Sequence, residues 1–225
     1  MSETLTLKAA DGHALDVYVA RPAGKPIAGL VVVQEIFGVN RHIRSVADGY
    51  AKDGFLVAAP AIFDRIEKGV ELAYEGPDIQ KAMAFLQKID ISEALADVDA
   101  ALQYVRKETG KKSGIIGYCF GGVLAWLSAA RLRPDAAVGY YAGRIGDFAA
   151  ETPKVPVQLH FGKLDTHIPA EQVEKVHVAH PEVEINWYEG AGHAFNRDVN
   201  PASYHAESAT LARGRALAFL KKHLS

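Results

Sequence analysis

Gly117-Tyr118-Cys119-Phe120-Gly121-Gly122 is the stretch from which the fold of this chain is best predicted. The short apolar segment 113–116 precedes it, and residues 123–130 after it are rich in good helix formers. A strand, a sharp turn and a helix are therefore expected. Glycines two residues on either side of Cys119 permit a strained turn that exposes the cysteine side chain. The pattern predicts a nucleophile elbow with cysteine in the usual position of serine.

The environment expected for Cys119 favours a reactive sulfur. The helix after the turn directs its first N–H groups and the positive end of its dipole at the side chain, which stabilises a thiolate. A single cysteine is, however, more often a small buried hydrophobic residue. The six-residue motif alone leaves the catalytic and the structural interpretation open, so partners elsewhere in the chain have to decide between them.

The composition is that of an ordinary globular protein, with 49% apolar and 23% charged residues among 225. An α/β domain of this length commonly remains undivided, so we expect a single domain over residues 1–225. The net charge is −2 and no basic run exceeds two residues. This excludes the electrostatic footprint of a protein that binds nucleic acid or an anionic membrane.

The number of cysteines and the N-terminal residues indicate where in the cell the protein is expected. One cysteine excludes an internal disulfide, and nothing in the sequence suggests a metal cluster of thiolates. The first seven residues are acidic and alternating, and the longest apolar run, residues 28–33, is far too short to span a bilayer. We therefore expect a cytoplasmic protein that contacts no membrane.

Strand and helix patterns alternate along most of the chain. Segments 5–8 and 14–19 flank the turn signal Asp11-Gly12 and predict an antiparallel hairpin. The β-branched run 29–33 predicts a central parallel strand. Further strands are expected at 55–59, 113–116, 136–141, 155–161 and 182–188, and helices at 42–52, 78–87, 92–107, 123–130, 171–179 and 203–223. This order predicts an α/β protein with a doubly wound, mostly parallel sheet.

Residues 61–91 interrupt this alternation. They contain no clear strand, and an excursion of this kind between two sheet strands often borders a pocket. The helix that follows is expected to begin with Ser92 as its N-cap.

Polar residues just past the strand ends supply partners for Cys119. In a doubly wound sheet the ligand site lies beyond the carboxyl ends of the strands. Asp165 follows the expected strand 155–161, and His193 follows the strand 182–188. The chain order nucleophile, acid, base is that of the α/β-hydrolase arrangement. It predicts His193 as general base and Asp165 as the group that orients it.

Other residues compete for these roles. Asp147, Glu189 and Asp198 are alternative acids near the same strand ends. His177 and His180 have a spacing that can bind metal on a helix, but no third ligand is evident, so surface histidines are expected there.

The chain resembles the dienelactone hydrolase family, also called carboxymethylenebutenolidases, of the α/β-hydrolase superfamily. The resemblance rests on Gln34-Glu35-Ile36-Phe37-Gly38, on the 117–122 elbow, on the loop 162–169 with Asp165, and on Gly192-His193-Ala194-Phe195 followed by Arg197. It implies the α/β-hydrolase fold and hydrolysis of a small lactone or ester through a thioester acyl-enzyme. It implies no metal and no organic cofactor.

The resemblance also implies a role for Glu35, which in the family lies beside the cysteine and takes part in its activation when substrate binds. The other interpretation of Glu35 is a strand-end residue hydrogen-bonded to a nearby loop. The oxyanion hole is expected to consist of the backbone N–H groups of Phe120 and Ile36. Phe37 and Phe195 are expected to wall the pocket, with a place in the core as the alternative.

Arg197 resembles the family's arginine that pairs with a substrate carboxylate, a task suited to its planar fork of donors. A surface arginine is the competing interpretation. The family's second arginine, with its tyrosine and tryptophan, is missing from residues 79–86, and Lys81 or Arg65 could stand in as a cation. This departure leaves the reaction type intact and makes the dienelactone substrate uncertain.

The sequence thus predicts a cysteine-dependent hydrolase of small lactones or esters that is a monomer or a small homo-oligomer. Arg197 points toward an anionic substrate. Two alternatives stay open: a thiol redox sensor or binding protein that keeps the fold without catalysis, and a carboxylesterase or thioesterase of broad range.

Overall fold

The computed structural model describes all 225 residues, whose contacts divide them into two units. The first unit comprises Met1–Ile115 with Leu224–Ser225, and the second comprises Ile116–His223. The expectation of a single domain stays a prediction. No helix in the structure is both long and apolar enough to cross a membrane.

The first unit contains the expected antiparallel hairpin, formed by β1 (Ser2–Lys8) and β2 (Ala14–Ala20). Strand β2 pairs antiparallel with β4 (Phe55–Pro60), which pairs in parallel with β3 (Ala28–Val33). Every residue of β3 and β4 is buried. Their continuous apolar runs are explained by helices on both sides of the sheet.

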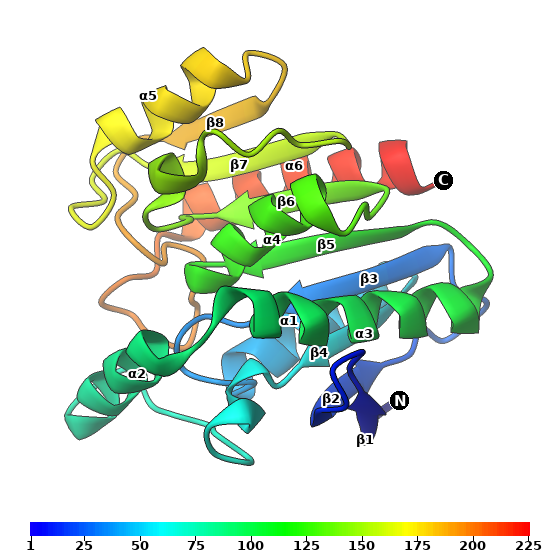
Figure 1. Ribbon diagram of the computed structural model, residues 1–225. Coiled ribbons are helices and arrows are strands. Elements are labelled where there is room, and N and C mark those ends of the chain that lie inside the picture. Colours follow the sequence, from blue (N-terminus) through cyan, green and yellow to red (C-terminus); the bar gives the residue numbers. More distant parts are fainter. The chain divides into compact units, whose positions relative to one another are not determined.

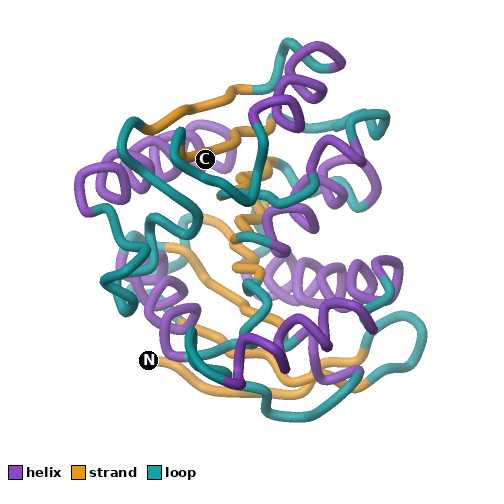
Figure 2. Tube along the Cα trace, turned by 90° about the vertical axis from the view of Figure 1, so that its left-hand side faces the viewer, coloured by secondary structure: helices purple, strands orange, loops and turns teal.

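Two helices cover opposite faces of these strands (Figures 1 and 2). They are α1 (Arg41–Lys52) and α3 (Ile91–Thr109). The side chain of Asn40 caps α1 by accepting hydrogen bonds from the backbone N–H groups of His42 and Ile43. This satisfies donors that a helix N-terminus otherwise leaves without partners.

The N-cap of α3 differs from the prediction, because Asp90 rather than Ser92 holds this position. The carboxylate of Asp90 accepts hydrogen bonds from the N–H groups of Ser92 and Glu93 at 2.8 and 3.0 Å. Aspartate caps a helix as well as serine does, and its negative charge adds a favourable interaction with the helix dipole.

Residues 61–91 form a short 3₁₀ helix, η1 (Ile62–Arg65), and the helix α2 (Pro77–Lys88). Between them the chain returns to the loop after β3, where Gly38 and Glu71 form an isolated bridge and the N–H of Leu72 donates to Phe37 O at 2.9 Å. Gly38 has a φ of 79°, and a Cβ there would lie 1.8 Å from Val70 O. Only glycine fits this crossing.

The second unit is a parallel arrangement of strands with helices on both faces (Figure 1). The strand β5 (Ser113–Tyr118) leads into it, and β6, β7 and β8 are neighbours in that order. Its remaining elements are α4 (Phe120–Arg131), β6 (Ala136–Tyr140), the 3₁₀ helix η2 (Ile145–Phe148), β7 (Val157–Gly162), α5 (Ala170–Ala179), β8 (Glu184–Tyr188) and α6 (Ala206–Leu224).

The closing helix begins three residues later than expected, at Ala206 rather than Ser203. Asn200 explains the difference, because its side chain accepts from the N–H of Ala202 and its carbonyl accepts from the N–H of Ser203. Such a turn centred on asparagine competes with the first turn of a helix.

Candidate active site

Cys119 occupies a strained turn between β5 and α4, with φ 53° and ψ −116°. Few residues other than glycine adopt a positive φ, and such strain persists where the surroundings enforce it. The glycines explain how the turn closes. A Cβ at Gly117 would lie 1.8 Å from Gly121 O, and one at Gly122 would lie 2.9 Å from Tyr140 O. The local geometry is therefore that of the predicted elbow.

The backbone around Cys119 is held from two sides. Its N–H donates to Tyr140 O at 3.0 Å, and its carbonyl accepts from the N–H of Gly122 at 2.9 Å. Helix α4 begins at Phe120, so the positive end of its dipole directly follows Cys119 in the chain. Cys119 itself is half-buried and is a free thiol.

Three predicted side chains meet in the second unit. The Nε2 atom of His193 lies 3.4 Å from Sγ of Cys119, and its Nδ1 atom lies 2.8 Å from Oδ2 of Asp165. Asp165 is almost fully buried, and its other oxygen accepts from the N–H of His167 at 2.8 Å. The carboxylate is thus fixed by the backbone and directed at the imidazole, which is directed at the thiol.

The electrostatic balance at His193 favours its charged form. Burial opposes the imidazolium, but the hydrogen bonds to Asp165 and Cys119 outweigh burial and raise the pKa of His193 to about 10. At neutral pH the imidazole of His193 is therefore charged, with its Nε2 atom beside the Cys119 sulfur. The arrangement places a proton donor next to that sulfur.

The loops that carry Asp165 and His193 leave neighbouring parallel strands at their carboxyl ends. Asp165 follows β7, and His193 follows β8. Leu164 N donates to Ala191 O at 2.9 Å, which ties one loop to the other. Ligands of parallel sheets bind beyond the carboxyl ends of the strands, which is where Asp165 and His193 lie.

Two of the three competing acids pair with cations away from His193. Asp147 pairs with Arg144, and Glu189 pairs with Lys163. Of the candidate acids, Asp165 is the one hydrogen-bonded to His193.

His180 is buried, so the expectation of a surface histidine was wrong for this residue. Its Nε2 donates to Ala149 O at 2.8 Å, and its ring packs 5.4 Å from that of Trp126. His177 is exposed, as expected. The neighbour that buries His180 is distant in sequence, which helical spacing does not reveal.

Arg197 is buried and is therefore not an ordinary surface arginine. It follows His193 by four residues, and its N–H donates to Ala194 O at 3.0 Å. Phe195 is fully buried against the rings of Tyr140, Tyr141 and Tyr188.

Apart from Phe120 at the start of α4, the remaining site candidates belong to the first unit. Glu35 is the second residue after the buried strand β3 and is itself fully buried. Ile36 is buried beside it, and the ring of Phe37 meets that of Tyr74 edge-on at 4.6 Å. Their predicted roles in activation, in the oxyanion hole and in the pocket wall stay predictions.

Both proposed replacements for the missing arginine have acidic partners within the first unit. Arg65 donates twice to Asp97 at 2.8 Å and also pairs with Asp11. Lys81 pairs with Glu67 at 2.8 Å. The Arg65–Asp97 pair is bidentate and Asp97 is fully buried, so releasing Arg65 for a substrate would leave a buried charge unpaired.

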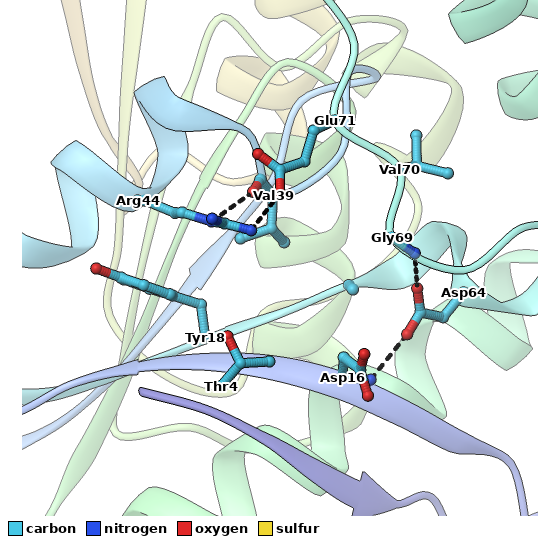
Figure 3. A pocket seen from close by; sticks show the side chains of 10 residues that line it. Thr4, Asp16, Tyr18, Val39, Arg44, Asp64, Gly69, Val70 and Glu71 are labelled. Atoms are coloured by element: carbon cyan, nitrogen blue, oxygen red, sulfur yellow. Dashed lines mark hydrogen bonds and ion pairs between the residues drawn. The ribbon is translucent and has the colours of Figure 1, made fainter. Parts of the chain in front are cut away.

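A cavity of about 70 Å³ in the first unit also gathers charged side chains (Figure 3). Arg44 donates to Val39 O and pairs with Glu71. Asp64 accepts from the N–H groups of Asp16 and Gly69 at 2.8 and 3.3 Å. The charges in this cavity thus bind one another or the backbone, as expected of a structural cluster.

Two residues that contact His193 were not predicted. The ring of Tyr141 lies 5.0 Å from the His193 ring, and the ring of His167 lies 5.2 Å from it, both edge-on. His167 lies two residues from Asp165, and Tyr141 follows the end of β6. The expected strand 136–141 includes Tyr141, so the sequence pattern did not place this residue past a strand end.

The chain is similar in sequence and in structure to known proteins. The model of the dienelactone hydrolase family matches residues 15–224. Carboxymethylenebutenolidases of Pseudomonas putida and Pseudomonas knackmussii are each 33% identical to it over 228 residues, covering 98% of this chain and 96% of theirs. A crystal structure of a candidate dienelactone hydrolase from Klebsiella pneumoniae is 30% identical, with a TM-score of 0.85 over 97% of both chains. The chain has the α/β-hydrolase fold and belongs to the dienelactone hydrolase family of carboxylic ester hydrolases.

Proposed function

We propose that this enzyme hydrolyses small lactones or esters through a thioester formed on Cys119. The observation that most supports the proposal is the line of contacts from Asp165 through His193 to Cys119. Each group has the neighbour that its role requires: a nucleophile beside a base, and a base oriented by a buried carboxylate.

The first step is attack of the Cys119 thiolate on the substrate carbonyl carbon. A C–S bond forms and the carbonyl π electrons move to oxygen. The N–H of Phe120 and, from the resemblance, the N–H of Ile36 would donate to this oxyanion. The raised pKa of His193 supports this step, because it keeps a charged imidazole beside the sulfur.

The tetrahedral intermediate then collapses and the C–O bond to the leaving group breaks. His193 gives its proton to the departing oxygen, which opens the ring of a lactone and leaves a thioester. The neutral imidazole next takes a proton from water, and the hydroxide attacks the thioester. The acid product leaves, and the thiolate and imidazolium return.

A carboxylate-bearing lactone is the substrate class that we propose. The name of the Pseudomonas relatives describes a butenolide, which is an unsaturated lactone, with a carboxyl-bearing substituent. The buried Arg197 lies four residues from His193. A guanidinium is a planar fork of donors that suits a carboxylate. Glu35 would assist activation of Cys119 when substrate binds, a role that rests on the resemblance.

The test is steady-state hydrolysis of a carboxylate-bearing dienelactone and of a neutral aryl ester by the wild type and by Cys119→Ala. We expect efficient turnover of the dienelactone and no activity of the variant on either substrate. If only the neutral ester reacts, the lactone class is wrong while the mechanism stands. Full activity of Cys119→Ala would overturn the mechanism.

A second test separates an enzyme from a thiol sensor. An activated ester should acylate Cys119 of the wild type, which adds the acyl mass to the intact protein, and the label should then disappear by hydrolysis. His193→Ala should be labelled far more slowly. Labelling that is independent of His193 and never hydrolysed would favour the sensor.

A further inference from the structure

Tyr141 has an unusual backbone for a fully buried residue. It directly follows β6 and has a φ of 34°, in the left-handed region that side chains other than glycine rarely adopt. Its N–H donates to His160 O at 2.8 Å, so the adjacent strand β7 fixes its backbone. A strained conformation held in this way is a common feature of functional sites.

The side chain of Tyr141 reaches the loop that carries His193. Its hydroxyl donates to Oδ1 of Asn196 at 3.0 Å, across 55 residues of sequence. Asn196 stands three residues after His193, in the irregular segment between β8 and α6. Ala194 in this segment has a φ of 58°, so the turn after His193 is also strained. The bond therefore ties a strained turn to the end of a sheet strand.

The neighbours of this bond belong to the candidate active site. The ring of Tyr141 meets the ring of His193 edge-on at 5.0 Å, with 60° between the planes. Tyr140, one residue earlier, accepts the N–H of Cys119 at 3.0 Å. The end of β6 thus contacts the backbone of the nucleophile and the ring of the base.

We propose that the Tyr141–Asn196 hydrogen bond is a latch that positions His193 between Cys119 and Asp165. Neither residue is catalytic, since neither reaches the reacting atoms; both are positioning residues. The proposal rests on the function proposed above. Because small displacements of a reacting group can cost orders of magnitude in rate, loosening the latch should lower kcat with little change in KM.

The experiment is a double-mutant cycle with Tyr141→Phe, Asn196→Ala and the double variant. A neutral ester is the substrate, so that effects on Arg197 do not enter. Tyr141→Phe keeps the ring against His193 and removes only the hydroxyl. We expect each single variant to lose about tenfold in kcat, and the double variant to lose no more than either one.

The matched control is Tyr18→Phe, which removes a hydroxyl that donates to Asp48 at 2.8 Å in the first unit. It should keep the wild-type kcat. The alkaline limb of the kcat/KM profile is a further readout, and it should move to lower pH in both latch variants but not in the control.

Two results would overturn the latch. The first is a wild-type kcat and pH profile in both single variants, even with a lower Tm, which would make the bond purely structural. The second is losses that multiply in the double variant, which would make the two residues independent. Failure of the proposed function would instead appear as undiminished activity of Cys119→Ala in the same assay.

Discussion

The cavity of Figure 3 and the Cys119 site both collect polar side chains, but they use them differently. Around the cavity, Asp64 binds backbone N–H groups and Arg44 pairs with Glu71, with no strained residue among them. At the other site Cys119 adopts a positive φ, and the pKa of His193 is raised to about 10. A cluster whose charged groups are all paired with one another or with the backbone stabilises the fold. Backbone strain and a strongly shifted pKa are instead typical of a site that carries out chemistry.

The largest effect should come from the nucleophile. Cys119→Ser should retain the fold and lose most of its activity, about a thousandfold or more in kcat, because a hydroxyl needs much stronger base assistance than a thiol. Circular dichroism checks the fold and steady-state kinetics check the loss. A serine variant with wild-type turnover would remove Cys119 from the role of nucleophile.

The charge of Asp165 should have the next largest effect. Asp165→Asn is expected to lower kcat by about a hundredfold or more, because the imidazolium loses its buried partner. His193 donates its proton only while charged, so the alkaline limb of kcat/KM should lie near pH 10 in the wild type. The variant has a lower His193 pKa, so its limb should move toward neutral pH. A limb at unchanged pH would contradict this origin of the shift.

Arg197→Ala tests whether the Cys119 site binds an anionic substrate. Its KM for a carboxylate-bearing lactone should rise about ten- to a hundredfold, while KM for a neutral ester changes little, because only the anion loses a charge-assisted hydrogen bond. Kinetics on the two substrates in parallel measure the difference. Equal losses on both would remove Arg197 from substrate recognition.

The smallest effect on activity should come from the cavity of the first unit. Asp64→Asn turns an N–H group toward backbone donors and should reduce the free energy of unfolding by about 1–3 kcal/mol without changing kcat/KM. Urea denaturation measures the loss. Glu71→Gln is the matched control and should cost less than about 1 kcal/mol, because its ion pair with Arg44 is exposed. A large loss of activity in Asp64→Asn would make the cavity part of the functional site.

Local rules account for what the sequence predicted well. Gly117 indicates the tight turn of the elbow, because a Cβ there would lie 1.8 Å from Gly121 O. The positions of Asp165 and His193 could be predicted, because residues that follow parallel strands lie at the same edge of the sheet. The buried runs of β3 and β4 and the hairpin before them follow equally from pattern and turn chemistry.

Tertiary contacts account for what the sequence left out. Asp90 and Ser92 are equally good caps two positions apart, so local preference could not choose between them. The hydrogen bond from Tyr141 to Asn196 joins residues that are 55 positions apart. Asn196 belongs to no recognisable motif. Buried His180 depends on a carbonyl of a distant turn.

The single cysteine of the chain has a consequence for its behaviour toward oxidants. Peroxide would convert a reactive thiolate at Cys119 to a sulfenic acid, which other proteins commonly trap as a disulfide with a second cysteine. This chain of 225 residues has no second cysteine. An oxidised molecule would therefore recover through a thiol from its surroundings, and without one a second peroxide would oxidise it to the irreversible sulfinic acid.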